Sequence, residues 1–288
     1  MSIARDGLSI KLAEFLSDQS FRNDATEPGT AQIVMLRGCK VNADGSLSAQ
    51  SGAGPVTTNR YDDVLAVFGQ KTGGQPYAAY YEATAQPGRV WVKHSSYNGI
   101  ARGCPTVQPG QYRYKRGTHR GHRAMVQAGS PVCVIRDIDQ DGVIEASDRV
   151  DYPIWTGINI HAGGLDDIVD WDSSGCQVIR GGWGGNAWTQ FYHIIYSVAK
   201  KQDIFHYALV DFAEFGRWHD AADRAMHKLL RFGSHGKHVA ALQAMLSRAG
   251  YYGAAICDGE FGRVTDEGLR AWQKATGQQP TGMVERLS

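Results

Sequence analysis

The sequence lacks any apolar run near the roughly 20 residues that a bilayer-spanning helix needs. It also lacks an excess of either charge, since 30 basic and 29 acidic residues give its 288 residues a net charge of +1. A chain without a positive excess has no electrostatic preference for nucleic acid or anionic membranes. We therefore expect neither a nucleic-acid partner nor a membrane span.

Cysteine is scarce and follows no pattern. The five cysteines are odd in number and include no Cys-x-x-Cys pair. This spacing argues against a disulfide framework or a structural zinc site and leaves at least one free thiol. Four of them, Cys39, Cys104, Cys133 and Cys257, are interpreted as small packing residues. The fifth, Cys176, lies in a more informative context.

The first residues lack the apolar core and the small-residue cleavage site of a secretory signal. Residues 8–16 instead have the spacing of an amphipathic helix. We therefore expect synthesis in the cytoplasm without export by a signal peptide.

The organisation changes near residue 222. Between about residues 31 and 196, short apolar runs alternate with turn residues, and we expect strands at 32–36, 90–92, 111–114 and 132–135. Helical spacing is found at 189–201 and 204–214. The 35 glycines are consistent with a loop-rich β body. The fold class predicted for residues 1–222 is mainly β, sandwich-like and α+β.

Residues 226–288 have the pattern of a small helical domain. Two amphipathic segments are separated by turn residues. The residues that carry the pattern are Val239, Leu242-Gln243, Met245-Leu246, Gly250-Tyr251, Asp258-Gly259, Phe261-Gly262, Thr265, Leu269, Trp272-Gln273 and Gly277. This segment resembles the three-helix peptidoglycan-binding domain found on cell-wall enzymes. The resemblance implies an all-α module with peptidoglycan as its partner.

Residues 137–148 fit a twelve-residue calcium loop. Oxygen ligands fall at the expected positions, glycine stands at position six, and an aspartate replaces the usual glutamate at position twelve. The predicted ligands are Asp137, Asp139, Asp141, the carbonyl of Val143, and Asp148. We expect a structural Ca²⁺ here, and the alternative is an acidic hairpin turn without metal.

A histidine and a cysteine lie fifteen positions apart, each beside a strand-like run. His161 ends the run that begins at Gly157, and Cys176 precedes Gln177-Val178-Ile179. Adjacent strands would bring both side chains to one edge, where the imidazole could deprotonate the thiol. The alternative is a buried structural cysteine near an unrelated histidine.

The Ser173-Ser174-Gly175-Cys176 turn, with its upstream histidine, is similar to the active site of the L,D-transpeptidase (YkuD-type) family. Residues 109–114 look like that family's Pro-x-Gly-x-Tyr strand. The resemblance implies a cysteine enzyme that attacks peptidoglycan stem peptides. The sequence departs from the family at Ala162, Ser174 and Val178, where a serine, a histidine and an arginine often stand.

The predicted function is therefore a peptidoglycan-acting cysteine enzyme that cleaves or exchanges stem-peptide amide bonds. The predicted site consists of Cys176 as nucleophile, His161 as base and Gly175 at the oxyanion site, with Ser173, Ser174, His119 and Asn159 near the substrate. Asn159 or a backbone carbonyl is expected to orient the imidazole. The acceptor, water or an amine, stays open.

Without an export signal, the expected role is a phage lysin or an injected antibacterial effector that reaches the cell wall by holin- or secretion-type delivery. Two other functions remain open. One is a non-catalytic wall-binding or virion structural protein, and the other is a metal-dependent peptidase that uses His119, His122 and His161.

Overall fold

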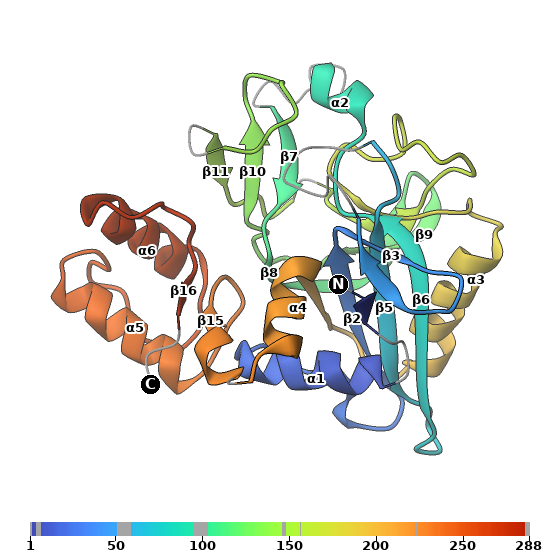
Figure 1. Cartoon of the computed structure of the whole chain (residues 1–288), viewed down its shortest axis with the longest axis horizontal. Coiled ribbons are helices and arrows are strands. Elements are labelled where there is room, and N and C mark those ends of the chain that lie inside the picture. Colours follow the sequence, from blue (N-terminus) through green and yellow to red (C-terminus); the bar gives the residue numbers. More distant parts are fainter. Residues whose placement is uncertain are drawn as a thin grey trace.

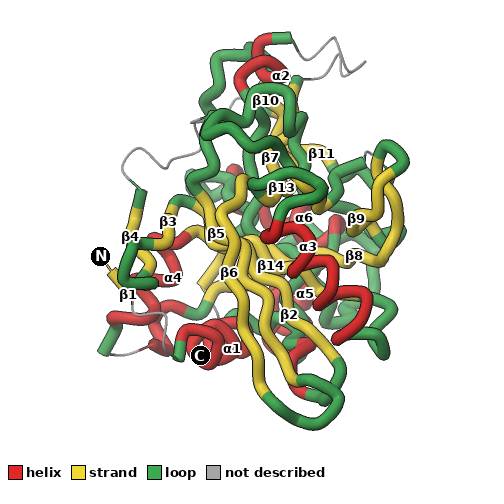
Figure 2. The backbone as a smooth tube through the Cα atoms, turned by 90° about the vertical axis from the view of Figure 1, so that its right-hand side faces the viewer, coloured by secondary structure: helices red, strands yellow, loops and turns green. Residues whose placement is uncertain are grey.

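The structure, a computed structural model, describes residues 2–3, 7–50, 59–94, 103–145, 148–155, 157–222 and 224–285. A closed barrel forms its body (Figures 1 and 2). The barrel strands are β2 (Thr30–Arg37), β5 (Asp63–Gln70), β6 (Pro76–Thr84), β8 (Gly110–His119), β9 (His122–Gln127), β12 (Ile160–Ala162), β13 (Gln177–Ile179) and β14 (Phe205–Asp211). Their order around the barrel is β12-β13-β6-β5-β2-β14-β8-β9. The β12/β13 and β2/β14 pairs are parallel, and the other pairs are antiparallel.

Side chains alternate between the two faces of the barrel strands, as the two-residue period of a strand requires. In β2, Ile33 and Met35 join the cluster that fills the barrel, whereas Val34 and Leu36 join a second cluster. Helices α1 (Leu8–Asp18) and α4 (Phe212–Asp220) cover the second cluster. The first cluster also includes side chains of α3 (Asn186–His193) and the π-helix η3 (Ile194–Val198).

Smaller elements surround the barrel. One sheet has the order β1-β4-β3, and another has the order β11-β10-β7 and lies at the top of the view in Figure 1. Their strands are β1 (Ser2–Ile3), β3 (Cys39–Val41), β4 (Leu47–Ala49), β7 (Cys104–Val107), β10 (Val134–Asp137) and β11 (Arg149–Asp151). The short helices are η1 (Asp24–Thr26), α2 (Arg89–Lys93) and η4 (Arg224–His227). Within the described ranges, no helix is both long and apolar enough to cross a membrane.

The C-terminal segment forms a module packed against the barrel (Figure 1). It contains α5 (Lys237–Arg248), α6 (Arg263–Ala275) and a two-stranded sheet of β15 (Leu229–Leu230) and β16 (Val284–Glu285). Phe232 stacks on Tyr112 of the barrel with ring centroids 5.4 Å apart. The Tyr152 hydroxyl donates a hydrogen bond of 2.5 Å to Asp266 of α6. One hydrophobic cluster contains residues of both parts, so they share a core.

The β-rich N-terminal part and the helical C-terminal part are confirmed, but the details differ from the prediction. The sheet closes into a barrel rather than forming a sandwich. The module has two helices and a strand pair among its described residues, not three helices.

Two elements were predicted with the wrong secondary structure. Residues 90–92 lie in helix α2, and the predicted helix at 204–214 is strand β14 followed by α4. Both errors concern short apolar runs. A strand buried on both faces is apolar throughout, so its residues do not alternate in polarity. The spacing of apolar residues in such a run therefore does not distinguish a strand from a helix.

Candidate active site

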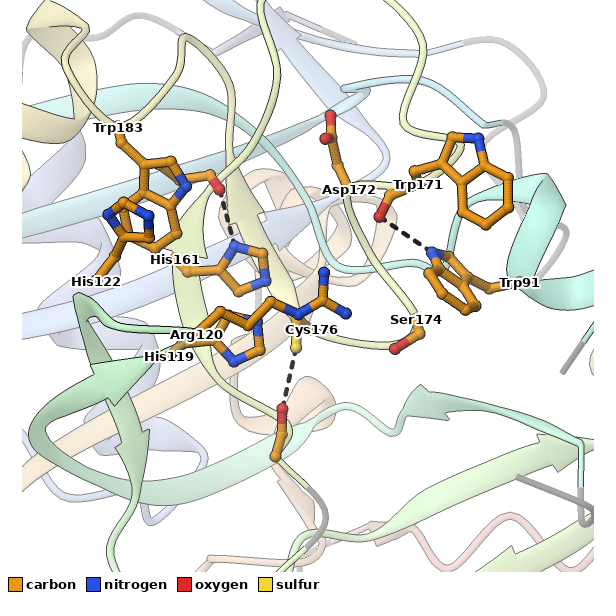
Figure 3. A pocket seen from close by; sticks show the side chains of 12 residues that line it. Trp91, His119, Arg120, His122, His161, Trp171, Asp172, Ser174, Cys176 and Trp183 are labelled. Carbon is orange, nitrogen blue, oxygen red and sulfur yellow. Dashed lines mark hydrogen bonds between the residues drawn. The ribbon is translucent and has the colours of Figure 1, made fainter. Parts of the chain in front are cut away.

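Two neighbouring barrel strands position the predicted nucleophile and base. Strands β12 and β13 run parallel, with His161 opposite Val178. Cys176 directly precedes β13, and both side chains line one cavity of about 430 Å³ (Figure 3). The structure therefore brings together the two residues on which the predicted chemistry depends.

The turn before Cys176 is held by Ser173 and requires glycine at 175. The buried Ser173 hydroxyl accepts a hydrogen bond from Gly175 N–H (3.1 Å) and donates one to the Cys176 carbonyl (2.8 Å). Ser173 thus fixes the turn, whereas Ser174 lines the cavity. The Gly175 amide, predicted to bind the oxyanion, is already bonded to Ser173. Of the two turn amides, Cys176 N–H is the better candidate for that role.

We expect Gly175→Ala to destabilise the fold and to displace the nucleophile. Gly175 has φ of +117°, and an added Cβ would lie 2.6 Å from the Pro105 carbonyl oxygen. A side chain in such a conformation costs about 1–3 kcal/mol. Urea denaturation should measure this loss. Gly184→Ala, where no atom lies within 4 Å of the added Cβ, is the control and should change stability little.

Cys176 is a buried, protonated thiol in this state. Its Sγ donates to the Gly157 carbonyl at 3.1 Å and accepts from Asn159 N–H at 3.5 Å. Burial raises the pKa of Cys176 to about 11, against smaller lowering effects of the Asn159 amide and the Arg120 charge. Because a thiolate is costly in this environment, proton transfer must accompany attack.

His161 is oriented as a neutral base. Its Nδ1 lies 2.8 Å from the Ala162 carbonyl oxygen, which can only accept, so Nδ1 carries the proton and Nε2 keeps a lone pair. Burial lowers the pKa of His161 to about 4. A backbone carbonyl therefore orients the imidazole. The Asn159 amide instead lies 2.9 Å from Nδ1 of His119.

Four rings form a stack along one wall of the cavity. His119 lies parallel to His161, with centroids 4.5 Å apart, and Trp183 lies near His161 at 5.9 Å. His122 stacks on Trp183 at 4.4 Å (Figure 3). The stack shields His161 from water, which contributes to its low pKa. Trp183 was not predicted as a site residue, and a tryptophan inside the glycine-rich run 181–185 was the available signal.

The opposite wall carries two tryptophans and a carboxylate. Trp91 and Trp171 meet edge to face at 5.2 Å, and the Trp91 indole donates to the Trp171 carbonyl. Asp172 accepts hydrogen bonds from the Tyr61 hydroxyl (2.6 Å) and from Gly164 N–H (2.7 Å). Arg120, at the tip of the β8–β9 hairpin, lines the same cavity. The cavity thus offers aromatic surfaces and charges of both signs.

We expect alkylation of Cys176 to depend steeply on pH. With a pKa near 11, its thiolate fraction at pH 7 is about 10⁻⁴, so the rate should rise about tenfold per pH unit from pH 7 to 10. Iodoacetamide labelling with peptide mass spectrometry, in a Cys257→Ser background that removes the exposed thiol, measures the rate. A plateau near neutral pH would instead indicate a stable thiolate–imidazolium pair.

The three histidines of the metal-dependent alternative do not form a ligand set. His119 and His161 are stacked face to face, and His122 lies against Trp183. Parallel rings direct their lone pairs along separate planes rather than toward one ion. Within the described ranges, the only group of three or more potential ligands with converging atoms lies in the calcium-type loop.

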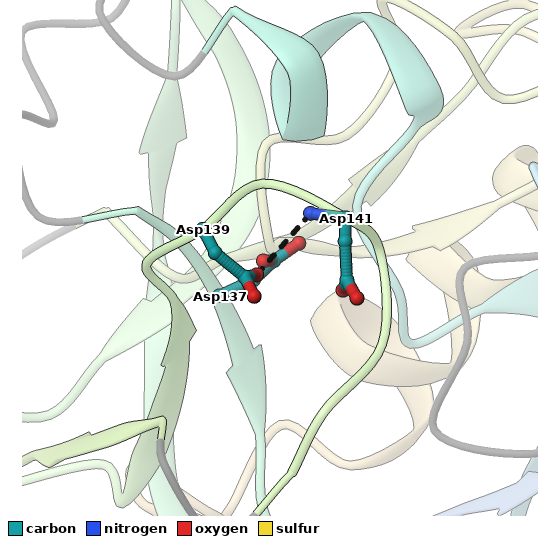
Figure 4. A group of neighbouring side chains, drawn as sticks. All are labelled: Asp137, Asp139 and Asp141. Carbon is teal, nitrogen blue, oxygen red and sulfur yellow. Dashed lines mark hydrogen bonds between the residues drawn. The ribbon is translucent and has the colours of Figure 1, made fainter.

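The loop brings three of its five predicted ligands together. Ligand oxygens of Asp137, Asp139 and Asp141 lie within 4.8 Å of one another (Figure 4). Burial raises the pKa of Asp137 to about 6. Val143 donates its N–H to Asp141. Asp148 lies outside the group and accepts hydrogen bonds from the amides of Ile138 (3.3 Å) and Glu145 (2.9 Å), closing the loop.

A buried glutamine organises the C-terminal module. Gln243 of α5 donates to Asp258 at 2.8 Å and accepts from Gly259 N–H at 2.8 Å. It also donates to Thr265 at 3.1 Å, which lies at the start of α6. Gly259 has φ of +74°, which favours glycine at this turn. These contacts explain why the motif residues of the module occur at their spacing.

Residues 235–287 match the family model described as "Putative peptidoglycan binding domain". This match supports the predicted peptidoglycan-binding module and peptidoglycan as its partner. No match was found among curated proteins or among solved structures. The resemblance of the barrel part to L,D-transpeptidases stays a prediction.

Proposed function

We propose that this chain is a peptidoglycan-binding cysteine enzyme that cleaves or exchanges amide bonds of stem peptides. The observation that carries the proposal is the placement of Cys176 and a neutral His161 in one cavity of a chain with a peptidoglycan-binding module. A binding module raises the concentration of the cavity near an insoluble polymer.

In the proposed reaction, the sulfur of Cys176 attacks the amide carbon while its proton passes to Nε2 of His161. The oxyanion that forms accepts a hydrogen bond from Cys176 N–H. The carbon–nitrogen bond breaks as His161 returns the proton to the leaving amine, which leaves a thioester on Cys176. Water or a second amine, deprotonated by His161, then attacks the thioester and releases the thiol.

Arg120 supplies a positive charge in the cavity that can bind a carboxylate of the substrate. Within the described ranges, the Arg120 side chain makes no ion pair or hydrogen bond, and it lines the cavity. A guanidinium binds carboxylates through paired hydrogen bonds, and stem peptides carry free carboxylates. In the proposed complex, Arg120 holds such a carboxylate while the exposed Trp171 covers the peptide.

The test uses purified murein and mass spectrometry of the released muropeptides. We expect wild-type protein to shorten or exchange stem peptides and to leave the glycan strands intact. The Cys176→Ala variant should still bind murein in a pull-down assay. The proposal would be contradicted if the glycan strands were cleaved, or if Cys176→Ala released the same peptide products as the wild type.

A role in wall degradation, as a lysin or antibacterial effector, is part of the proposal. Directed to the periplasm of a test bacterium by an added leader peptide, the wild type should lyse the cells. The Cys176→Ala variant, expressed at the same level, should not. Lysis by both the wild type and Cys176→Ala would show that cell killing does not require the Cys176 thiol.

The second candidate is a non-catalytic wall-binding protein. The observation in its favour is the buried thiol, which is protonated and bonded to the Gly157 carbonyl. Binding to murein with unchanged muropeptides, by wild type and Cys176→Ala alike, would favour it. The metal-dependent peptidase gains no support, because the rings of His119 and His161 are stacked.

A further inference from the structure

The loop after β10 contains a buried carboxylate oxygen without a partner. Asp137 is 3% exposed, and within the described ranges its Oδ1 has no hydrogen-bond partner. Its other oxygen accepts from Gly142 N–H at 2.9 Å. A buried charged oxygen that lacks a partner costs several kcal/mol, so such atoms are normally paired or bound to a metal. A bound cation would supply the partner that Oδ1 of Asp137 lacks.

The side chains grouped with the Asp137 carboxylate are acceptors rather than donors. Ligand oxygens of Asp139 and Asp141 lie within 4.8 Å of a ligand oxygen of Asp137 (Figure 4). The hydrogen bonds found for these three carboxylates come from backbone amides of the loop, which do not neutralise their negative charges. Three converging oxygens form the start of a coordination shell for a hard divalent cation.

We propose that this loop binds one Ca²⁺ through Asp137, Asp139, Asp141 and the carbonyl oxygen of Val143, with water completing the shell. Ca²⁺ takes six to eight oxygens in a flexible arrangement, whereas Mg²⁺ demands a small octahedron. Asp148 acts from outside the shell, because both of its oxygens hold backbone amides of the loop. With few protein ligands, the expected affinity is that of weak extracellular sites, a Kd of about 0.1–1 mM.

The bound cation also supports the turn that carries the nucleophile. Asp137 ends β10 and lies opposite Cys104 of β7, and Arg136 lies opposite Pro105. The position of a Cβ on Gly175 is only 2.6 Å from the Pro105 carbonyl oxygen, so this strand lies directly against the turn. Fixing the loop therefore fixes β7 and, through it, the backbone before Cys176.

The experiment is calorimetric titration of the chelator-treated full chain with CaCl₂, and separately with MgCl₂. We expect a single calcium site. At 10 mM Ca²⁺ the melting temperature should rise by about 3–8 °C, and Mg²⁺ should give a smaller shift. Hydrogen exchange should slow in the peptides that contain residues 104–107 and 173–179. Binding is read without murein, so failure here is separate from failure of the proposed enzyme.

Asp139→Asn is the test variant, because Asp139 is exposed and its loss should not prevent folding. We expect its calcium affinity to fall at least tenfold and its thermal shift to disappear. Asp203→Asn, an exposed aspartate outside the loop, is the matched control and should bind like wild type. Absence of calcium binding by wild type, equal binding by Asp139→Asn, or equal shifts with Mg²⁺ would overturn the proposal.

Discussion

Replacing Cys176 with alanine is expected to lower the rate of stem-peptide cleavage by at least about 10⁴-fold, because the covalent route is lost. Alanine removes the sulfur but fits the space of the buried side chain, which is 5% exposed. The variant should therefore fold and bind murein like wild type. Initial rates of muropeptide release at several murein concentrations provide the measurement.

Two companion variants make the result specific. Cys257→Ala removes an exposed thiol outside the cavity and should keep the wild-type rate. His161→Gln should lose a similar factor near neutral pH but regain activity as the pH approaches the Cys176 pKa of about 11, where the thiol ionises without a base. A Cys176→Ala enzyme with a wild-type rate would exclude the thiol as nucleophile.

Replacing Arg231 with methionine is expected to destabilise the protein by about 3–5 kcal/mol, because it leaves the largely buried Glu214 carboxylate, 11% exposed, without its partner. Arg231 is 1% exposed, and its guanidinium makes a bidentate pair with Glu214 of α4. It also donates to Gln19 at 2.9 Å. The variant thus affects the junction between the helices α1 and α4 and the C-terminal module.

Urea denaturation of the full chain measures this loss. The double variant Arg231→Met/Glu214→Leu should recover much of the stability, because it removes both charges. The exposed pair Arg22–Glu260 also joins the two parts, with side chains 40% and 55% exposed. Arg22→Met is the control and should cost less than about 1 kcal/mol. Equal losses for both arginine variants would contradict the burial argument.

The elements that could be predicted from the sequence have local signals. Helix α1 and the two helices of the module show clear apolar periodicity, and the turn at Asp258-Gly259 has a motif. Barrel closure has no such signal. It depends on pairings such as β2 with β14, which lie far apart in the chain, and single-sequence patterns do not specify them.

The placement of Cys176 and His161 in one cavity was predictable from the sequence, but the surroundings of the two side chains were not. Cys176 and His161 stand beside strand-like runs, which gave the prediction. The role of Ser173 in the turn, the pairing of Asn159 with His119, and the contribution of Trp183 all depend on tertiary contacts. For the same reason Asp148 was predicted to be a calcium ligand, whereas its oxygens accept hydrogen bonds from loop amides.

The packing of the C-terminal module on the barrel restricts which bonds of the wall polymer the proposed enzyme can reach. A flexible linker would let an anchored catalytic part sample a volume around its anchor. Here Phe232 stacks on Tyr112 of the barrel, and Asp266 accepts a hydrogen bond from Tyr152, which follows the flanking strand β11. The fold therefore sets the distance from the binding module to the thiol. Stem peptides recur along the murein strands. With a fixed distance between the binding module and Cys176, the thiol reaches only those stem peptides that lie at that distance from the point where the module binds. In partial digests, the cleaved stem peptides should therefore occur at regular positions along the intact glycan strands rather than at random ones.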